Sequence, residues 1–401
     1  MTRFVPTSVD ELREAVAAAL AAEEPVELVG GGTKRGLGRP LQTPHVLDLN
    51  RLSGIRDYAP SELVLTAGAA TPLTAIDRAL AAAGQMLAFE PPDWRGLLGQ
   101  VHGSQTLGGI LACNLSGPRR IKSGAARDHF LGFRAVSGRA EVFKAGGKVV
   151  KNVTGYDLPK LMAGSYGTLA ALEEVTVKVL PRPETAATVI VFGVAAEHAV
   201  EAMAAALGSP HEVSGAAYLP PGTPRLTSLI SGFGMVALRI EGPAPSVAYR
   251  RDALLRQFAD SDETAELGDA KTQALWRDIG NAVPLAGLAD RAIWRLSVAP
   301  SRGAEVAQAI ARTIDAVWFL DWGGGLVWLA VIEPGDAGAS VIRRAIGGAG
   351  HATLIRGSPG LRAAVPVFEP QPGPLAALSR RVKDGFDPKH ILNPARMVEG
   401  S

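Results

Sequence analysis

Three separated clusters of glycine limit most strongly what this chain can fold into. They lie at Gly30-Gly31-Gly32, at Gly108-Gly109, and between Gly155 and Gly167, where the sequence reads GYDLPKLMAGSYG. Glycine at this density raises the entropic cost of folding, so it indicates backbone that must come close to a ligand or to another chain segment. Three such places in one chain are typical of a single extended ligand that carries phosphate.

Composition excludes several classes of protein. The 401 residues predict about two domains, and 41 basic against 39 acidic residues leave a net charge of +2, without the basic stripe of a nucleic-acid binder. Cys113 is the only cysteine, so the chain can form no intrachain disulfide. It also cannot hold an iron–sulfur cluster alone, because such a cluster needs about four thiolates. The start has no signal-peptide core, and the uncharged segment 96–118 is too polar to span a bilayer, so we expect no transmembrane segment and a cytoplasmic protein.

Hydrophobic periodicity predicts a mixed α+β fold. Ser8 and Glu11 form a potential capping box before a helix in which Leu12, Val16 and Ala19 recur at helical spacing. A second helix is expected from an N-cap at Thr71 to Gly84. Strands are expected at 26–29, 46–49, 63–67, 175–179, 235–240 and 294–298, in a hairpin of 141–144 with 148–151, and in two strands within 318–332 that are joined through Asp321–Gly325. The composition of the sequence changes after 181–183, which indicates a domain boundary.

The first glycine cluster does not fit a Rossmann fingerprint. That motif needs a third glycine that opens a helix, but Arg35 occupies the position, and Gly36, Gly38 and Pro40 disfavour a helix. A coil of successive amides can still bind an anion, with Lys34 and Arg35 adding positive charge. A glycine-rich surface loop without a ligand remains the alternative.

The second segment, 107–118, consists mainly of small residues. Asn114 and Ser116 are isolated hydrogen-bonding groups in it, which suits a surface that packs against a flat ring. We interpret Cys113 as a small buried residue rather than a point of covalent attachment. The basic run 119–122 is either a solvated face or a contact to a ligand or partner.

The ordered set of motifs resembles a known family. Gly-Gly-Gly-Thr at 30, the segment 108–120, Lys-Asn-Val-Thr-Gly-Tyr-Asp-Leu at 151 and Gly-Ser-Tyr-Gly-Thr-Leu at 164 follow the order of flavoproteins of the vanillyl-alcohol-oxidase type, whose FAD domain is also called PCMH-type. More narrowly, the chain resembles the FAD-binding subunit of bacterial glycolate oxidase. The motifs that carry this narrower likeness are Glu90-Pro91-Pro92, 117–120, 179–183, 321–324, 350–353 and Asn393-Pro394-Ala395-Arg396-Met397.

This resemblance implies a layout. Residues 1–182 would form a PCMH-type FAD-binding domain of two α+β subdomains, residues 183–385 a smaller α+β cap, and residues 386–401 a segment returning to the FAD domain. The loop at 30–35 would follow the pyrophosphate, and no histidine is near it, so noncovalent FAD is expected. The implied cofactor-binding residues are Gly30, Gly31, Gly32, Thr33, Lys34, Thr106, Gly108, Gly109, Asn114, Ser116, Gly117, Asp128, Gly164, Gly167, Thr168 and Val175.

The chain departs from the catalytic members of this class in the cap. Those enzymes carry a histidine-rich metal motif there, whereas residues 183–401 contain four separated histidines, so we expect no metal site. Oxidation of a hydroxy acid needs a base and a cation that holds the carboxylate. His351 is the candidate base, with an ordinary structural histidine as the alternative, and Arg356 or Arg396 could hold the carboxylate, with surface arginines as the alternative.

Three functions follow as expectations. The first is an FAD-binding subunit of a complex that oxidises glycolate to glyoxylate. In it the substrate would be oxidised mainly on a homologous FAD-containing catalytic subunit, and electrons would pass to an iron–sulfur subunit. In that case the complex could attach to the inner membrane from the cytoplasm. The second is a complete FAD-dependent 2-hydroxy-acid dehydrogenase of the D-lactate type. The third is a scaffolding subunit whose flavin site has decayed.

Overall fold

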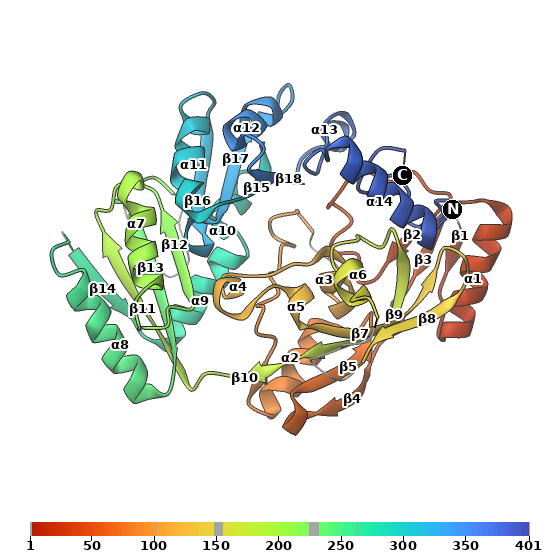
Figure 1. Ribbon diagram of the computed structural model, residues 1–401, viewed down its shortest axis with the longest axis horizontal. Helices are drawn as coiled ribbons and strands as arrows, with labels where there is room; N and C mark the ends of the chain where they lie inside the picture. Colours follow the sequence, from red (N-terminus) through yellow and green to blue (C-terminus); the bar gives the residue numbers. More distant parts are fainter. Residues whose placement is uncertain (1, 101, 148–154, 224–231, 262, 401) are drawn as a thin grey trace.

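The computed structural model describes residues 2–100, 102–147, 155–223, 232–261 and 263–400. The chain forms two α+β bodies that lie side by side (Figure 1). The first contains the N-terminal half together with the C-terminal tail, and the second contains the middle of the chain. The strand predicted at 148–151 and the start of the motif at 151–154 lie outside the described residues.

A small parallel sheet opens the first body. Strands β1 (Thr2–Phe4), β3 (His45–Asp48) and β2 (Val26–Val29) pair in the order β1-β3-β2, beside helix α1 (Val9–Ala22). Ser8 caps α1 as predicted, because its hydroxyl accepts a hydrogen bond from the Glu11 amide. The second half of the capping box does not form, since the Glu11 carboxylate accepts from Thr7 instead.

An antiparallel sheet of five strands follows in the same body. Its order is β4-β5-β9-β7-β8, with β4 at Ile55–Ala59, β5 at Val64–Gly68, β9 at Ala170–Lys178, β7 at Phe130–Ser137 and β8 at Val142–Gly146. The alternation predicted in β9 is confirmed, because Val175 and Val177 are fully buried while the Thr176 hydroxyl meets that of Thr66 at 2.9 Å.

Short elements connect these strands. They are 3-10 helix η1 (Pro60–Glu62), helices α2 (Leu73–Ala82), α3 (Leu107–Cys113), α4 (Arg120–Ser123), α5 (Ala126–His129) and α6 (Leu158–Met162), and the strand pair β6 (Gln85–Met86) and β10 (Leu180–Pro181). The N-cap predicted at Thr71 is wrong by one residue, because Pro72 holds that position. The Thr71 hydroxyl is engaged elsewhere: it donates to the Gly68 carbonyl at 2.6 Å and accepts from the Gly54 amide.

The second body is built on an antiparallel sheet of eight strands. Their order is β14 (Glu263–Leu267), β11 (Thr185–Phe192), β13 (Met235–Gly242), β12 (Gly215–Leu219), β16 (Ala316–Asp321), β17 (Leu326–Ile332), β15 (Arg291–Val298) and β18 (Gly350–Arg356). Strands β16 and β17 are the predicted pair, and the turn between them contains 3-10 helix η3 (Trp322–Gly324).

The two faces of this sheet have different neighbours. Met203, Leu254, Ile310 and Ile342 pack on one face from helices α7 (Ala196–Leu207), α8 (Ala244–Gln257), α11 (Gly303–Ala311) and α12 (Ala339–Ile346). The other face joins a core that runs into the first body, together with α9 (Asp269–Gly280) and α10 (Val283–Ala286). The remaining elements of this body are 3-10 helix η2 (Pro300–Arg302) and the connecting loops.

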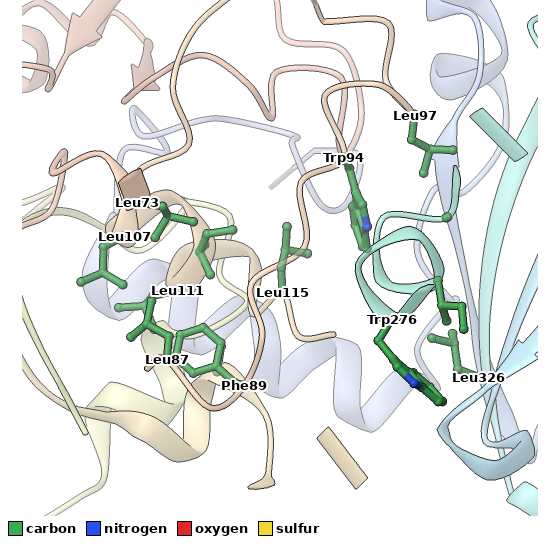
Figure 2. Close-up of a cluster of buried hydrophobic side chains, with 14 of the residues drawn as sticks. Leu73, Leu87, Phe89, Trp94, Leu97, Leu107, Leu111, Leu115, Trp276 and Leu326 are labelled. Atoms are coloured by element: carbon green, nitrogen blue, oxygen red, sulfur yellow. The ribbon is translucent and has the colours of Figure 1, made fainter. Parts of the chain in front are cut away.

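One apolar core therefore joins the two bodies. Figure 2 shows Leu115 and Trp94 between Phe89 of the first body and Trp276 and Leu326 of the second. The Trp94 indole donates to the Gly280 carbonyl at 3.0 Å and meets the Trp328 ring edge-on. Because a continuous apolar interface resists separation, we expect the two bodies to move as one rigid unit.

The C-terminal part of the chain returns to the first body. Helices α13 (Pro359–Ala364) and α14 (Gly373–Phe386) lie beside it in Figure 1, and the buried Lys383 ammonium donates to the Thr168 carbonyl at 2.7 Å and to Asp387. Leu392 forms a parallel bridge with Val26. The tail thus extends the small parallel sheet at the edge where the first glycine cluster begins.

Candidate functional site

A cleft opens in the first body at the end of strand β2. Its empty volume is about 830 Å³, including space that opens to solvent, which lies within the roughly 300–1,000 Å³ of small-molecule sites. Nine of the residues predicted to bind a cofactor line it: Gly30, Gly31, Gly32, Thr33, Lys34, Thr106, Gly108, Gly109 and Gly167. The first two glycine clusters and the end of the third, far apart in sequence, therefore meet around one space.

The loop after β2 forms one wall. It contains turns and no helix between residues 30 and 40, as predicted. A Cβ on Gly31 would lie 1.6 Å from the Ser104 carbonyl oxygen, so this glycine is required by the approach of another chain segment. Gly32 has φ +74° and nothing within 4 Å of its Cβ position, so it leaves room for a ligand.

Helix α3 forms the opposite wall, and sequence reasoning missed this helix. Two glycines in the first turn obscure the helical pattern in the sequence. The Thr106 hydroxyl nevertheless caps the helix by accepting from the Gly109 amide at 3.2 Å. A Cβ on Gly108 would lie 2.7 Å from the Ala69 carbonyl oxygen, so α3 packs tightly on strand β5 and the residues after it. A Cβ on Gly109 would meet only Thr106, at 3.0 Å. This glycine therefore adds no side chain to the cleft wall, and no tight contact to another segment requires it.

Lys34 supplies an unpaired cation in the cleft. Its ammonium donates to the Thr33 hydroxyl at 3.2 Å and to the Gln105 side-chain oxygen at 3.0 Å, and it forms no ion pair within the described part of the chain. Burial lowers the pKa of Lys34 to about 8. The neighbouring Arg35 is different, because it pairs with Glu27. An anion in the cleft would therefore meet the Lys34 ammonium.

Cys113 lines the cleft as a half-buried thiol. Burial raises its pKa to about 11, so the thiol stays protonated and unreactive at neutral pH.

The other seven predicted cofactor residues lie outside the cleft lining. Three of them hold the backbone of the loops beside α3: Asn114 accepts from the Arg127 amide, Ser116 from the Ala126 amide and Asp128 from the Ala125 amide. A Cβ on Gly117 would lie 2.5 Å from the Glu90 carbonyl oxygen. The remaining three are Gly164 at φ +82°, Thr168, which donates to the Ser165 carbonyl, and the fully buried Val175.

The candidate residues of the cap lie apart from the cleft or are engaged elsewhere. His351 is exposed on β18, opposite Ser297 of β15, and does not line the cleft. Arg356 donates to the carbonyls of Leu97, Ala286, Leu288 and Arg291. Arg396 does line the cleft, but it donates to the carbonyls of Arg35, Leu37 and Arg39 and to Glu27. These two arginines hold the main chain in place.

Sequence reasoning missed two residues that the fold brings to the cleft. Asn393 accepts from the Leu28 amide and donates to the Tyr166 carbonyl, each at 2.8 Å, and so ties the tail to two walls. Tyr166 has φ +54° and contacts Phe368 edge-on. The Asn393–Met397 motif was the available signal for the tail.

Comparisons with known proteins find relatives along the whole chain. Residues 3–146 match the family described as FAD binding domain. The chain is 34% identical over 387 residues to glycolate oxidase subunit GlcE of Escherichia coli K12, which covers 96% of each protein. It is 30% identical to glycolate oxidase subunit GlcD of Bacillus subtilis 168, over 47% of this chain and 38% of that one.

Two solved structures share the fold across the chain. Alkyldihydroxyacetonephosphate synthase aligns with a TM-score of 0.67 and 19% identity over 98% of this chain and 75% of that one. 4-Ethylphenol oxidase from Gulosibacter chungangensis aligns with a TM-score of 0.67 and 13% identity, over 99% and 89%. At these identities the likeness is one of fold. None of the described helices has the length and apolar character needed to cross a membrane.

Proposed function

We propose, from the premise that this chain belongs to the family of FAD-binding glycolate oxidase subunits, that it oxidises glycolate to glyoxylate as part of a multi-subunit complex. The α+β, PCMH-type fold predicted from the sequence is confirmed, and FAD is the cofactor. The finer assignments of substrate, partners and residue roles are proposals. The observation that carries them is the 34% identity to a glycolate oxidase subunit over 96% of this chain, together with the cleft that the glycine clusters of this chain line.

The residues of the cleft fit the cofactor. Gly32 leaves room on one wall, Gly109 adds no side chain to the other, and Lys34 offers an ammonium that forms no direct ion pair among the described residues. We assign the pyrophosphate to the amides of residues 30–34 and to Lys34, since successive amides and an unpaired cation are the groups that bind phosphate. No histidine lines the cleft within the described residues, and we propose noncovalent binding.

The reaction needs two groups besides the cofactor. Oxidation of a 2-hydroxy acid breaks the C–H bond of the hydroxyl-bearing carbon and the O–H bond of the hydroxyl, and forms a carbonyl. FAD supplies the acceptor for the hydride, and a base takes the proton. His351 remains the proposed base. The two electrons then pass to an iron–sulfur subunit, beside a homologous FAD-containing subunit, in a complex that we place in the cytoplasm at the inner membrane.

A complete dehydrogenase of the D-lactate type is the second candidate, because the chain itself supplies a second body beside the one that holds the cleft (Figure 1). Anaerobic bleaching of the flavin distinguishes the two functions. The purified chain should be yellow and should bleach with glycolate only after the partner subunits are added. Bleaching by glycolate or D-lactate with this chain alone would favour the complete dehydrogenase. A colourless chain that takes up no added FAD would indicate a scaffolding subunit and would refute both. Heat denaturation should release the flavin, which a covalent bond would prevent.

A further inference from the structure

Two guanidinium groups meet at the same indole ring between the two bodies. The Arg120 guanidinium carbon lies 4.2 Å from the Trp322 ring centroid, and that of Arg295 lies 4.8 Å from it. Arg120 belongs to α4 of the first body, whereas Arg295 belongs to β15 and Trp322 to η3 of the second. The ring is fixed, because it is 5% exposed and its N–H donates to the Gly117 carbonyl at 3.1 Å.

Neither guanidinium has a partner that balances its charge. Among the described residues, the side chains of Arg120 and Arg295 form no ion pair and no hydrogen bond, and the Arg295 Nε is buried without an acceptor. Their neighbours show what a satisfied arginine looks like here: Arg119 pairs with Glu90 and Glu241, and Arg239 pairs with the same two carboxylates. Two like charges held at one ring repel each other, so an arrangement of this kind is costly unless an anion joins it.

The charged groups around Arg295 come from several elements. Arg120 and the ionised form of Asp321 act on it from α4 and the end of β16, and the neutral phenol of Tyr166 lies near it in the loop before β9. Burial, together with Arg120, lowers the pKa of Arg295 to about 10, so the guanidinium stays charged at neutral pH. Asp321 is buried, and one of its oxygens accepts from the Trp322 amide. Burial raises the pKa of Asp321 to about 7, so at neutral pH it offsets the two cations only in part.

This pair of cations adjoins the cofactor cleft. Tyr166 lines the cleft, and Arg295 is one of the charged groups near enough to influence the pKa of its phenol. The unpaired guanidinium of Arg295 therefore lies near the part of the cleft wall that Tyr166 forms. Guanidinium groups bind a carboxylate through paired N–H groups, and each of these two is held against the same indole ring.

We propose that Arg120 and Arg295 bind the carboxylate of a small 2-hydroxy acid over Trp322, so that the two bodies share the substrate site. This inference rests on the proposed function for the identity of the acid. It replaces Arg356 and Arg396 as carboxylate ligands, because both of those donate to main-chain carbonyls.

Oxalate is the probe, because it carries carboxylates and has no hydrogen to donate. The FAD-loaded full chain is titrated with oxalate in a calorimeter at constant ionic strength, with chloride as the competing anion. The variants are Arg120→Gln and Arg295→Gln, and Arg344→Gln is the matched control, because Arg344 is exposed on α12. Each of the first two should weaken oxalate binding about 10- to 100-fold with unchanged FAD content, and the control should not.

Failure of this inference and failure of the proposed function give different results. Wild-type oxalate affinity in both variants, or no oxalate binding by the wild type, would overturn the site even if glycolate is oxidised. Arginine-dependent oxalate binding without glycolate oxidation in the assembled complex would keep the site and refute the function. If a variant fails to fold, phenylglyoxal labelling of the wild type decides: oxalate should protect Arg120, and equal labelling with and without oxalate would contradict the site.

Discussion

Raising the pH from 7 to 9 should weaken FAD binding about tenfold through Lys34. Burial lowers the pKa of this ammonium to about 8, and the pyrophosphate of the cofactor favours its charged form. The contribution of Lys34 to affinity is therefore present below pH 8 and is lost as the pH rises through 8. The loss begins near the pKa of Lys34 in the free protein and is complete once the pH exceeds the higher pKa of Lys34 in the FAD complex.

The size of the effect follows from the charged fraction of the lysine. With a pKa of about 8, roughly 90% of Lys34 is charged at pH 7 and roughly 10% at pH 9. Binding at pH 9 must first protonate most of the molecules, which weakens the affinity about tenfold, or by about 1.4 kcal/mol. Lys34→Met should bind FAD more weakly than the wild type at pH 7 and should show little change between pH 7 and 9.

The assay is the quenching of FAD fluorescence during titration with apoprotein at pH 7, 8 and 9 and constant ionic strength. Lys271→Met is the matched control, because this exposed lysine lies on α9 of the second body. It should keep both the wild-type affinity and the wild-type pH dependence. A dissociation constant that stays within twofold between pH 7 and 9 would refute the role of Lys34, as would the same slope in Lys34→Met.

Three further outcomes are expected. Gly31→Ala should lose most bound FAD, because its Cβ would lie 1.6 Å from a carbonyl oxygen, whereas Gly36→Ala in the same loop meets only a leucine methyl at 3.7 Å and should keep FAD; equal flavin absorbance in the two variants would contradict this. Arg239→Leu leaves Glu90 with one cation and should lower the free energy of unfolding by about 3–5 kcal/mol in a denaturant titration, while an unchanged midpoint would count against the ion-pair network. His351→Ala should keep FAD, because this exposed residue does not line the cleft, and the flavin content of the purified variant checks it.

The periodic elements were predictable from sequence, and the reason is local. Helix α1 and strand β9 bury one face, so their apolar residues repeat at 3.6 and 2 positions. Helix α3 was not predictable in this way, because Gly108 and Gly109 are poor helix formers. Its stability comes from the Thr106 cap and from contact with Ala69, which lies 39 residues earlier in the chain.

The candidate site was predictable where glycine itself carried the signal. The loop at 30–34 and the start of α3 meet at one cleft, as the glycine clusters indicated. Asn114, Ser116 and Asp128 are harder to place, because polar side chains that face a ligand and those that hold a loop look alike in sequence. The Asn393–Met397 motif indicated that the tail returns to the first body, but the contacts of Asn393 at the cleft follow only from the fold, since its partners Leu28 and Tyr166 are hundreds of residues away.

The tail that bridges to strand β2 has a consequence for synthesis of the protein. Asn393 and Arg396 complete walls whose other parts were translated more than two hundred residues earlier. A nascent chain therefore cannot finish its flavin site until these residues have left the ribosome tunnel. FAD is therefore bound in a finished site only by chains that have been translated through Asn393 and Arg396. A nascent chain that stalls on the ribosome before these residues has no such site.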